Sequence, residues 1–205
     1  MFMPRRGSGT AVARSRTIVA LACFLLAGCA APQHAGTARG PTAASIDWLN
    51  RTYRLTCDGL APAAFRATVV AGRARVPADG SSAPFYDHYD VTVGATATGD
   101  VDGDGAPDAV VLLNCSPQPS NGTVQEVQLF SPTGALLGGL PSPRTLRGDA
   151  PLAPVYAPAG LSIQHGEIVA AMRAYGPTDS HASGPSVPLT VRWRFARQGF
   201  VRVAP

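Results

Sequence analysis

The chain has 205 residues, with 17 basic and 13 acidic side chains, and every basic side chain is an arginine. Four of the 17 arginines and no acidic residue precede Cys29, so the remainder carries 13 arginines against 13 acids. The positive excess therefore belongs to the first 28 residues. It gives no support to nucleic-acid binding by the rest of the chain.

The N-terminal segment has the layout of an export signal. Residues 1–16 carry the four arginines, and residues 17–28 are almost wholly apolar. A basic stretch followed by a short apolar core and small residues is typical of a secretory signal. The apolar run is too short for a membrane-spanning helix, which needs roughly 20 residues.

The apolar run ends in Leu26-Ala27-Gly28-Cys29. These four residues resemble the bacterial lipobox, in which the cysteine receives a diacylglyceryl group and the signal peptide is cut before it. We therefore expect removal of residues 1–28, lipidation of Cys29, and a protein anchored in the cell membrane outside the cytoplasm. A plain secretory signal with a coincidental cysteine is the alternative.

The rest of the chain divides into a tether and one domain. Residues 29–45 are rich in Ala, Gly, Pro and Thr and show no apolar periodicity, so we interpret them as the lipidated cysteine followed by a flexible tether. Residues 46–205 are numerous enough for a single domain with a substantial core. Residues 46–51 are expected to form one short helical turn.

Two cysteines remain when Cys23 leaves with the signal and Cys29 is lipidated. An even pair in an exported chain predicts a disulfide between Cys57 and Cys115. A metal site is the rival interpretation, which is weakened by the absence of CxxC spacing.

Hydrophobic periodicity within the domain indicates strands. Apolar and polar residues alternate in four segments, which are residues 52–57, 65–69, 89–98 and 189–195. Ala109–Asn114 is a continuous apolar run, typical of a central strand buried on both faces. Further candidate strands are Val124–Phe130, Leu161–Gln164 and Glu167–Tyr175, with hairpin turns at His165-Gly166 and Gln198-Gly199. The expected fold is mostly β, an antiparallel sandwich or strongly curved sheet of about eight to ten strands with little helix.

One loop carries a candidate metal site. Asp100, Asp102, Asp104 and Asp108 stand at positions 1, 3, 5 and 9 of a segment between two strands, and Gly105 stands at position 6. Ca²⁺ prefers six to eight oxygen ligands, and this spacing wraps a loop around one ion. The carbonyl group of Ala106, at position 7, could add a backbone ligand. Position 12 is Val111 rather than glutamate, so the loop is not an EF-hand.

The same loop allows a second interpretation. It resembles the calcium loops of the FG-GAP and VCBS repeats, but those repeats occur in tandem and this chain has one copy. Asp and Gly are also favourable turn residues, so the segment could be a turn that binds no cation. If an ion binds, we expect it to brace the fold rather than to catalyse.

A family resemblance is carried by Tyr53, Cys57 and the segment Gly99–Cys115, followed by a strand that ends at Phe130 with Gly134 shortly after it. This order is similar to the actinobacterial LppP/LprE-type lipoproteins, in which an Asp-Gly-Asp-Gly loop leads into an apolar strand ending in Cys. The resemblance covers about residues 51–137. It implies a cell-envelope lipoprotein and supplies no reaction and no catalytic residues.

Two weaker signals concern function. Asp179, Ser180 and His181 suggest a hydrolase, but no Gly-x-Ser-x-Gly motif is present. Residues 85–90 form an aromatic and acidic cluster, which we expect to start a strand with its rings packing beneath a loop. Contact with a sugar or peptide is the alternative. We therefore expect a non-enzymatic lipoprotein with a binding or structural role at the cell surface. The alternatives are an envelope-polymer hydrolase and a calcium-dependent adhesion module, and the sequence identifies neither a protein nor a glycan partner.

Overall fold

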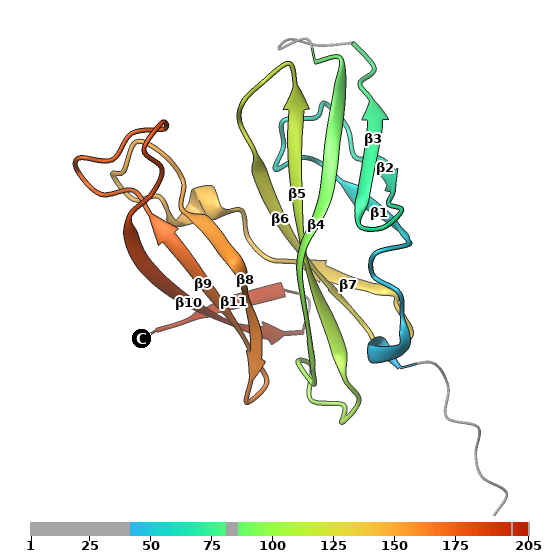
Figure 1. The fold of residues 1–205 in the computed structure, drawn as a ribbon. Helices are drawn as coiled ribbons and strands as arrows, with labels where there is room; N and C mark the ends of the chain where they lie inside the picture. Colours follow the sequence, from blue (N-terminus) through green and yellow to red (C-terminus); the bar gives the residue numbers. More distant parts are fainter. Residues whose placement is uncertain (1–41, 81–85, 198, 205) are drawn as a thin grey trace, which may run out of the picture. The chain divides into compact units, whose positions relative to one another are not determined.

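The structure is a computed structural model that describes residues 42–80, 86–197 and 199–204 (Figure 1). All of the described residues belong to one compact unit, Ala38–Pro205. Cys29 and the predicted signal peptide therefore lie outside the described residues. The described part is mostly β, as the periodicity predicts, with eleven strands and two short 3₁₀ turns, η1 (Ala43–Ser45) and η2 (Pro143–Leu146).

The strands form three antiparallel sheets. The central sheet has the order β3-β4-β5-β6-β7, with bounds Arg73–Pro77, His88–Gly99, Asp108–Gln118, Val124–Phe130 and Leu136–Gly139. A four-stranded sheet has the order β11-β10-β9-β8, whose strands are, in chain order, β8 (Val155–Gln164), β9 (Glu167–Ala174), β10 (Val187–Ala196) and β11 (Gly199–Val203). The third sheet is the pair β1 (Thr52–Leu55) and β2 (Phe65–Thr68).

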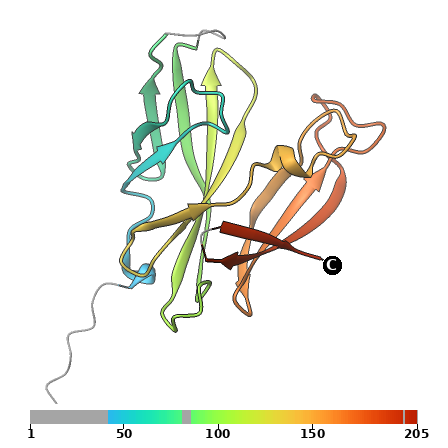
Figure 2. The ribbon, with the colours of Figure 1, turned by 180° about the vertical axis from the view of Figure 1, so that it is seen from behind.

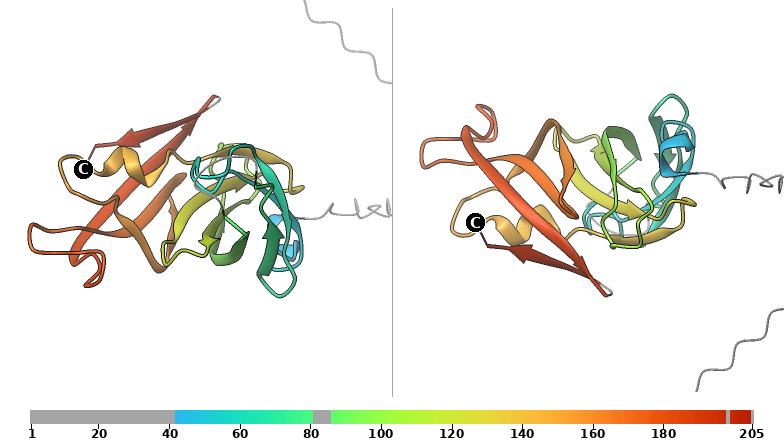
Figure 3. Two further views of the ribbon diagram at one scale, coloured as in Figure 1. Left: turned by 90° about the horizontal axis from the view of Figure 1, so that it is seen from above. Right: turned by 90° about the horizontal axis from the view of Figure 1, so that it is seen from below.

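The central sheet is covered on both faces. The β1–β2 pair lies against one face, as Figure 2 shows, and the four-stranded sheet lies against the other, so that three layers are visible end-on in Figure 3. Each interface between layers has its own buried cluster of apolar side chains. The domain is thus a β sandwich with an additional two-stranded layer.

Strand β5 contributes to both clusters, which confirms the prediction for Ala109–Asn114. Val111 and Leu113 belong to the cluster beneath β1–β2, whereas Val110 and Leu112 belong to the cluster beneath β8–β11. Successive side chains of a strand point to opposite faces. A strand covered on both faces therefore needs an uninterrupted apolar sequence, as this segment has.

Three short strands account for the larger strand count. The predicted eight to ten strands did not include β3, β7 or an explicit β11, and each of these has at most five residues at the edge of its sheet. Edge strands have one neighbour and little apolar burial. Their alternation is consequently too brief to stand out in the sequence.

The predicted turns agree with the structure only in part. The helical turn expected at residues 46–51 was wrong in position, because the turn is η1 and residues 46–51 form bends and turns. The turn at His165-Gly166 is confirmed, with both residues in the left-handed region. In the β10–β11 hairpin, Ala196 pairs with Gly199, so the turn begins one residue earlier than predicted; its Gln198 lies outside the described residues.

The layer formed by β1 and β2 is attached by the predicted disulfide. Cys57 and Cys115 are bonded across a sequence separation of 58 residues, and both are buried. Tyr53 and Leu55 point inward with Cys57, as the alternation predicts. The strand expected to start in residues 85–90 begins at His88, and Phe85 lies outside the described residues. Tyr89 is buried and stacks on Phe65 of β2 with ring centroids 4.8 Å apart, so its ring packs beneath a strand rather than a loop.

Candidate functional site

The aspartate-rich loop joins the two longest strands of the central sheet. Strand β4 ends at Gly99 and β5 begins at Asp108, so Asp100–Pro107 forms the connection. Asp108 is fully buried because it begins the central strand. Its Oδ2 atom accepts hydrogen bonds from the amides of Val101, at 3.0 Å, and Asp102, at 3.3 Å.

The other carboxylates fold the loop around themselves. Asp100 accepts hydrogen bonds from the amides of Gly103, at 2.7 Å, and Gly105, at 3.0 Å. Both glycines have φ above +80°, a backbone conformation that residues with a side chain rarely adopt. This conformation explains why glycine occupies both positions. The Asp104 amide donates to Asp102 Oδ1, and the Ala106 amide donates to Asp104 Oδ1. The sequence therefore builds turns from the same side chains that were predicted as ligands.

Three of the four predicted carboxylates converge. One oxygen each from Asp100, Asp102 and Asp108 lies within 4.8 Å of the others, close enough to share one cation. Asp104 is not part of this group. The ligand set that the structure brings together is therefore smaller than the set predicted from spacing.

Asp108 also provides an unsatisfied atom at this site. Its Oδ1 is buried and has no hydrogen-bond partner among the described residues. Burial raises the pKa of Asp108, and the charges of Asp102 and Asp104 raise it further, against the lowering effect of the Val101 and Asp102 amides. A buried carboxylate without full solvation is costly unless a positive charge accompanies it. Carboxylate oxygens are the ligands that Ca²⁺ prefers, so this donor set fits a hard cation.

The loop lies beside the hairpin of the second sheet. A Cβ atom placed on Gly166, in the β8–β9 turn, would be 3.8 Å from the carbonyl oxygen of Asp100. A Cβ placed on Gly99 would be 2.8 Å from Cγ2 of Ile163, in β8. The loop thus lies where the central sheet and the four-stranded sheet meet.

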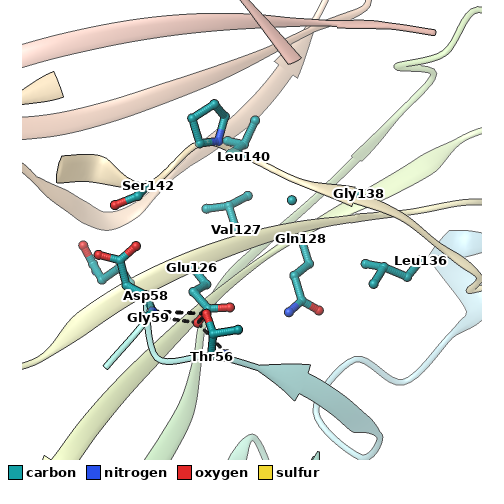
Figure 4. Close-up of a pocket in the computed structure, with 13 residues that line it drawn as sticks. Thr56, Asp58, Gly59, Glu126, Val127, Gln128, Leu136, Gly138, Leu140 and Ser142 are labelled. Carbon is teal, nitrogen blue, oxygen red and sulfur yellow. Dashed lines mark hydrogen bonds between the residues drawn. The ribbon is translucent and has the colours of Figure 1, made fainter. Parts of the chain in front are cut away.

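A second polar centre, which the sequence analysis missed, surrounds Glu126 in β6. Its Oε1 atom accepts three hydrogen bonds, from the Thr56 amide (2.9 Å), the Thr56 hydroxyl (3.0 Å) and the Asp58 amide (2.7 Å), as Figure 4 shows. The Asp58 carboxylate in turn forms an ion pair with Arg144, with 2.9 Å between Oδ2 and Nε. No local motif could indicate this centre, because Glu126 and Thr56 are 70 residues apart in the sequence.

Two cavities flank the Asp58–Arg144 ion pair. The first, of about 320 Å³ (Figure 4), includes Asp58 and Glu126 among its lining residues, and we call it the acidic cavity. The second, of about 360 Å³, includes Arg144, Arg147 and His181, and we call it the basic cavity. A narrow space of about 70 Å³ is lined by both Asp58 and Arg144 and lies between them.

The residues considered for a hydrolase have other contacts. Asp179 accepts hydrogen bonds from the amides of Gly176 and Ser186 and from the Ser186 hydroxyl, and these bonds lower its pKa. Ser180 bonds to Ser183 rather than to His181. Within the described residues, these side chains therefore form a closed loop and do not form a serine–histidine–aspartate arrangement.

Comparison of the chain with protein-family models, curated proteins and solved structures finds no match. In the part of the chain that the structure describes, no helix has the length and apolar character needed to cross a membrane.

Proposed function

We propose that this protein is an exported, lipid-anchored and non-enzymatic lipoprotein of the cell envelope. Its β domain has a binding or structural role at the cell surface, and a Ca²⁺ ion held by the β4–β5 loop braces the domain. The observation that carries the calcium proposal is the convergence of the Asp100, Asp102 and Asp108 carboxylates, of which Asp108 has a buried oxygen without a partner among the described residues.

Support for the anchor comes from the sequence. Leu26-Ala27-Gly28-Cys29 follows a basic and then apolar segment, and the arginine excess is confined to that segment. The Cys57–Cys115 disulfide agrees with export, because disulfides persist in oxidising compartments. Acyl chains on one cysteine would provide stable anchoring at about 0.8 kcal/mol for each buried CH₂ group.

Support for calcium comes from the charge balance of the loop. Asp100, Asp102 and Asp108 would hold the ion, which would supply the positive charge that three close carboxylates lack. The loop adjoins β8 and the β8–β9 turn, so an ion at this position would stabilise the junction between two sheets. This location favours a structural role for the ion over a catalytic one.

Cell fractionation tests the anchor. Wild-type protein is expected in the membrane fraction, and Cys29→Ala is expected to be absent from the lipidated pool and released or retained as an unprocessed precursor. Metabolic labelling with a fatty acid distinguishes the wild type from the variant, because label should enter only the wild type. Labelled Cys29→Ala protein would contradict the lipobox interpretation.

Calorimetric titration with CaCl₂ tests the metal site. Calcium is expected to raise the melting temperature of the chelator-treated protein, because a ligand that binds only the native state stabilises it. Asp108→Asn should abolish the heat of binding and the shift, whereas Asp149→Asn, an exposed aspartate outside the group, should retain both. An unchanged melting temperature in millimolar calcium would refute the site.

A further inference from the structure

The basic cavity collects residues from four separate parts of the chain. Its lining includes Leu60 after the disulfide, Val124 at the start of β6, the segment after η2, and Tyr175 and His181 from the connection between β9 and β10. Its volume of about 360 Å³ falls at the small end of the range for ligand pockets, which is roughly 300–1,000 Å³.

The cavity has a one-sided charge. Its lining residues include Arg144, Arg147 and His181 and no aspartate or glutamate. Asp58, which pairs with Arg144, lines the neighbouring acidic cavity instead. The ion pair therefore separates two spaces of opposite character, with the guanidinium group on one side and the carboxylates on the other.

The two arginines of the basic cavity differ in their interaction partners. The Arg144 side chain is held by Asp58 at 2.9 Å, whereas the Arg147 guanidinium group has no hydrogen-bond or ion-pair partner among the described residues. A guanidinium group presents five N–H donors in a planar fork that matches carboxylate and phosphate groups. Arg147 is thus the available cation of the cavity, with Arg144 as a second positive charge nearby.

The rest of the lining is largely apolar. Leu60, Val124, Leu152 and Val155 supply aliphatic side chains, and Tyr175 supplies an aromatic ring. Small-molecule sites commonly combine such a surface with a few polar groups that fix orientation. An inorganic anion alone would leave this apolar surface without a partner.

The loop that carries His181 is held in place by its own hydrogen bonds. Asp179 Oδ2 accepts from the Gly176 amide at 2.7 Å, the Ser186 amide at 2.9 Å and the Ser186 hydroxyl at 2.9 Å. Ser180 and Ser183 add further bonds around His181. A side of the cavity that is ordered before binding reduces the entropy lost on association.

We propose that the basic cavity binds a small amphiphile with an anionic head group, a carboxylate or a phosphate, and a short apolar body. Arg147 contacts the head group, Arg144 adds a favourable charge, and the apolar body lies against Leu152 and its aliphatic neighbours. This proposal is independent of the lipid anchor and of the calcium loop.

Calorimetric titration with four probes of equal chain length tests the class of ligand. The protein used is the chain from residue 30 onward, which retains both apolar clusters and the disulfide. Octanoate and octyl phosphate carry the two candidate head groups, octanol is neutral, and octylamine is cationic. We expect at least one anionic probe, below its micellar concentration, to bind about tenfold more tightly than octanol, as a charged hydrogen bond allows. The tighter of the two anionic probes identifies the head group.

Two substitutions locate the site. Arg147→Gln should weaken binding of the anionic probe about tenfold and leave octanol binding unchanged, because octanol has no anionic head group for the guanidinium group to contact. Arg202→Gln, an exposed arginine of β11 that does not line the cavity, should change neither. Leu152→Glu should abolish anionic binding by placing a negative charge in the cavity.

The melting temperature of each variant verifies that it is folded. Equal affinity for all four probes, or no binding of any, would overturn the proposal. So would an Arg147→Gln variant with wild-type affinity for the anionic probe, because the head group would then lie elsewhere.

Discussion

At the scale of single residues, Glu126 stabilises a left-handed backbone conformation at Cys57 and Asp58, which residues with a side chain disfavour. Cys57 and Asp58 have φ values of 49° and 53°, in the left-handed region, and Gly59 follows at 78°. For residues other than glycine this conformation costs about 1–2 kcal/mol each. The three hydrogen bonds to Glu126 Oε1 come from Thr56 and Asp58, on either side of Cys57, and offset that cost. The disulfide cysteine is thus oriented by a carboxylate from another sheet.

We predict that Glu126→Ala lowers the free energy of unfolding by about 1–2 kcal/mol, because three donors lose a charged acceptor at a partly exposed site. Glu126→Gln keeps an oxygen acceptor and should lose about half as much. Urea denaturation of the oxidised protein measures both values. Equal stability of the wild type and Glu126→Ala would show that the strained turn is held by the disulfide alone.

At the scale of elements, strand β4 changes the face that it presents. A bulge at Gly94 separates Val93, which pairs with Leu113, from Ala95, which pairs with Leu112. Val91 and Val93 consequently pack beneath β1–β2, whereas Ala95 and Ala97 pack toward the four-stranded sheet. Because side chains alternate between the two faces of a strand, one extra residue moves every later side chain to the opposite face of the sheet. The sequence alternates continuously through this point, so the alternation predicts the strand but does not reveal that it changes face.

The end of β4 at Gly99 packs closely on β8. Gly99→Ala would put a methyl group 2.8 Å from Cγ2 and 3.0 Å from Cβ of Ile163, and the branched Cβ cannot move aside without its strand. We expect a loss of about 1–3 kcal/mol, typical of overpacking.

Thermal unfolding measures the effect of Gly99→Ala against Gly199→Ala, whose added methyl group would meet nothing within 4 Å. Because Gly99 adjoins the aspartate loop, the Gly99→Ala variant should also show a smaller calcium-induced shift. Equal melting temperatures for the two variants would contradict the close contact of β4 with β8.

At the scale of the whole molecule, carboxylates with opposite pKa shifts determine how stability depends on pH. Hydrogen bonds lower the pKa of Asp90 through Arg75, of Glu167 through Arg194, and of Asp179 through the Gly176 amide. These groups stabilise the fold above their ordinary pKa values, and this contribution is lost as the pH falls through the lowered values. The pKa shift of Asp108 has the opposite sign, because burial raises the pKa of this carboxyl group. Its contribution is present below its ordinary value and is lost as the pH rises through the raised value.

We therefore predict that, in chelator, Asp108→Asn raises the melting temperature at pH 7 and that this gain shrinks as the pH falls to about 4 and below. The buried charge is absent from the variant at every pH, whereas wild-type Asp108 becomes neutral only on acidification. Melting curves between pH 3 and pH 7 provide the measurement. Calcium should reverse the order of the two proteins at pH 7, and a gain that is independent of pH would refute this assignment.

Features with a local cause were predictable from the sequence. The β class follows from alternation with period two, the buried central strand from the apolar run at Ala109–Asn114, and the disulfide from the count of cysteines in a chain that is expected to be exported. The lipidation of Cys29 rests on sequence alone and stays a prediction. The strands depend on residue type at short spacing and the disulfide on the number of cysteines, and both properties are visible along the chain.

Features that depend on distant segments were decided by the tertiary structure. The spacing of the aspartates did not reveal that Asp104 stays outside the carboxylate group while Asp108 is buried with a free oxygen. Nothing near Glu126 indicated its bonds to Thr56, and nothing near Arg147 indicated a cavity shared with His181. The physical reason is that burial and partnership arise when sheets pack face to face, and packing joins residues that are far apart in the sequence. The sequence by itself thus determined the β class, most of the strands, the cysteine pair and the expected place of export, and only the packing of three sheets decided which charged groups have partners and which are available to bind.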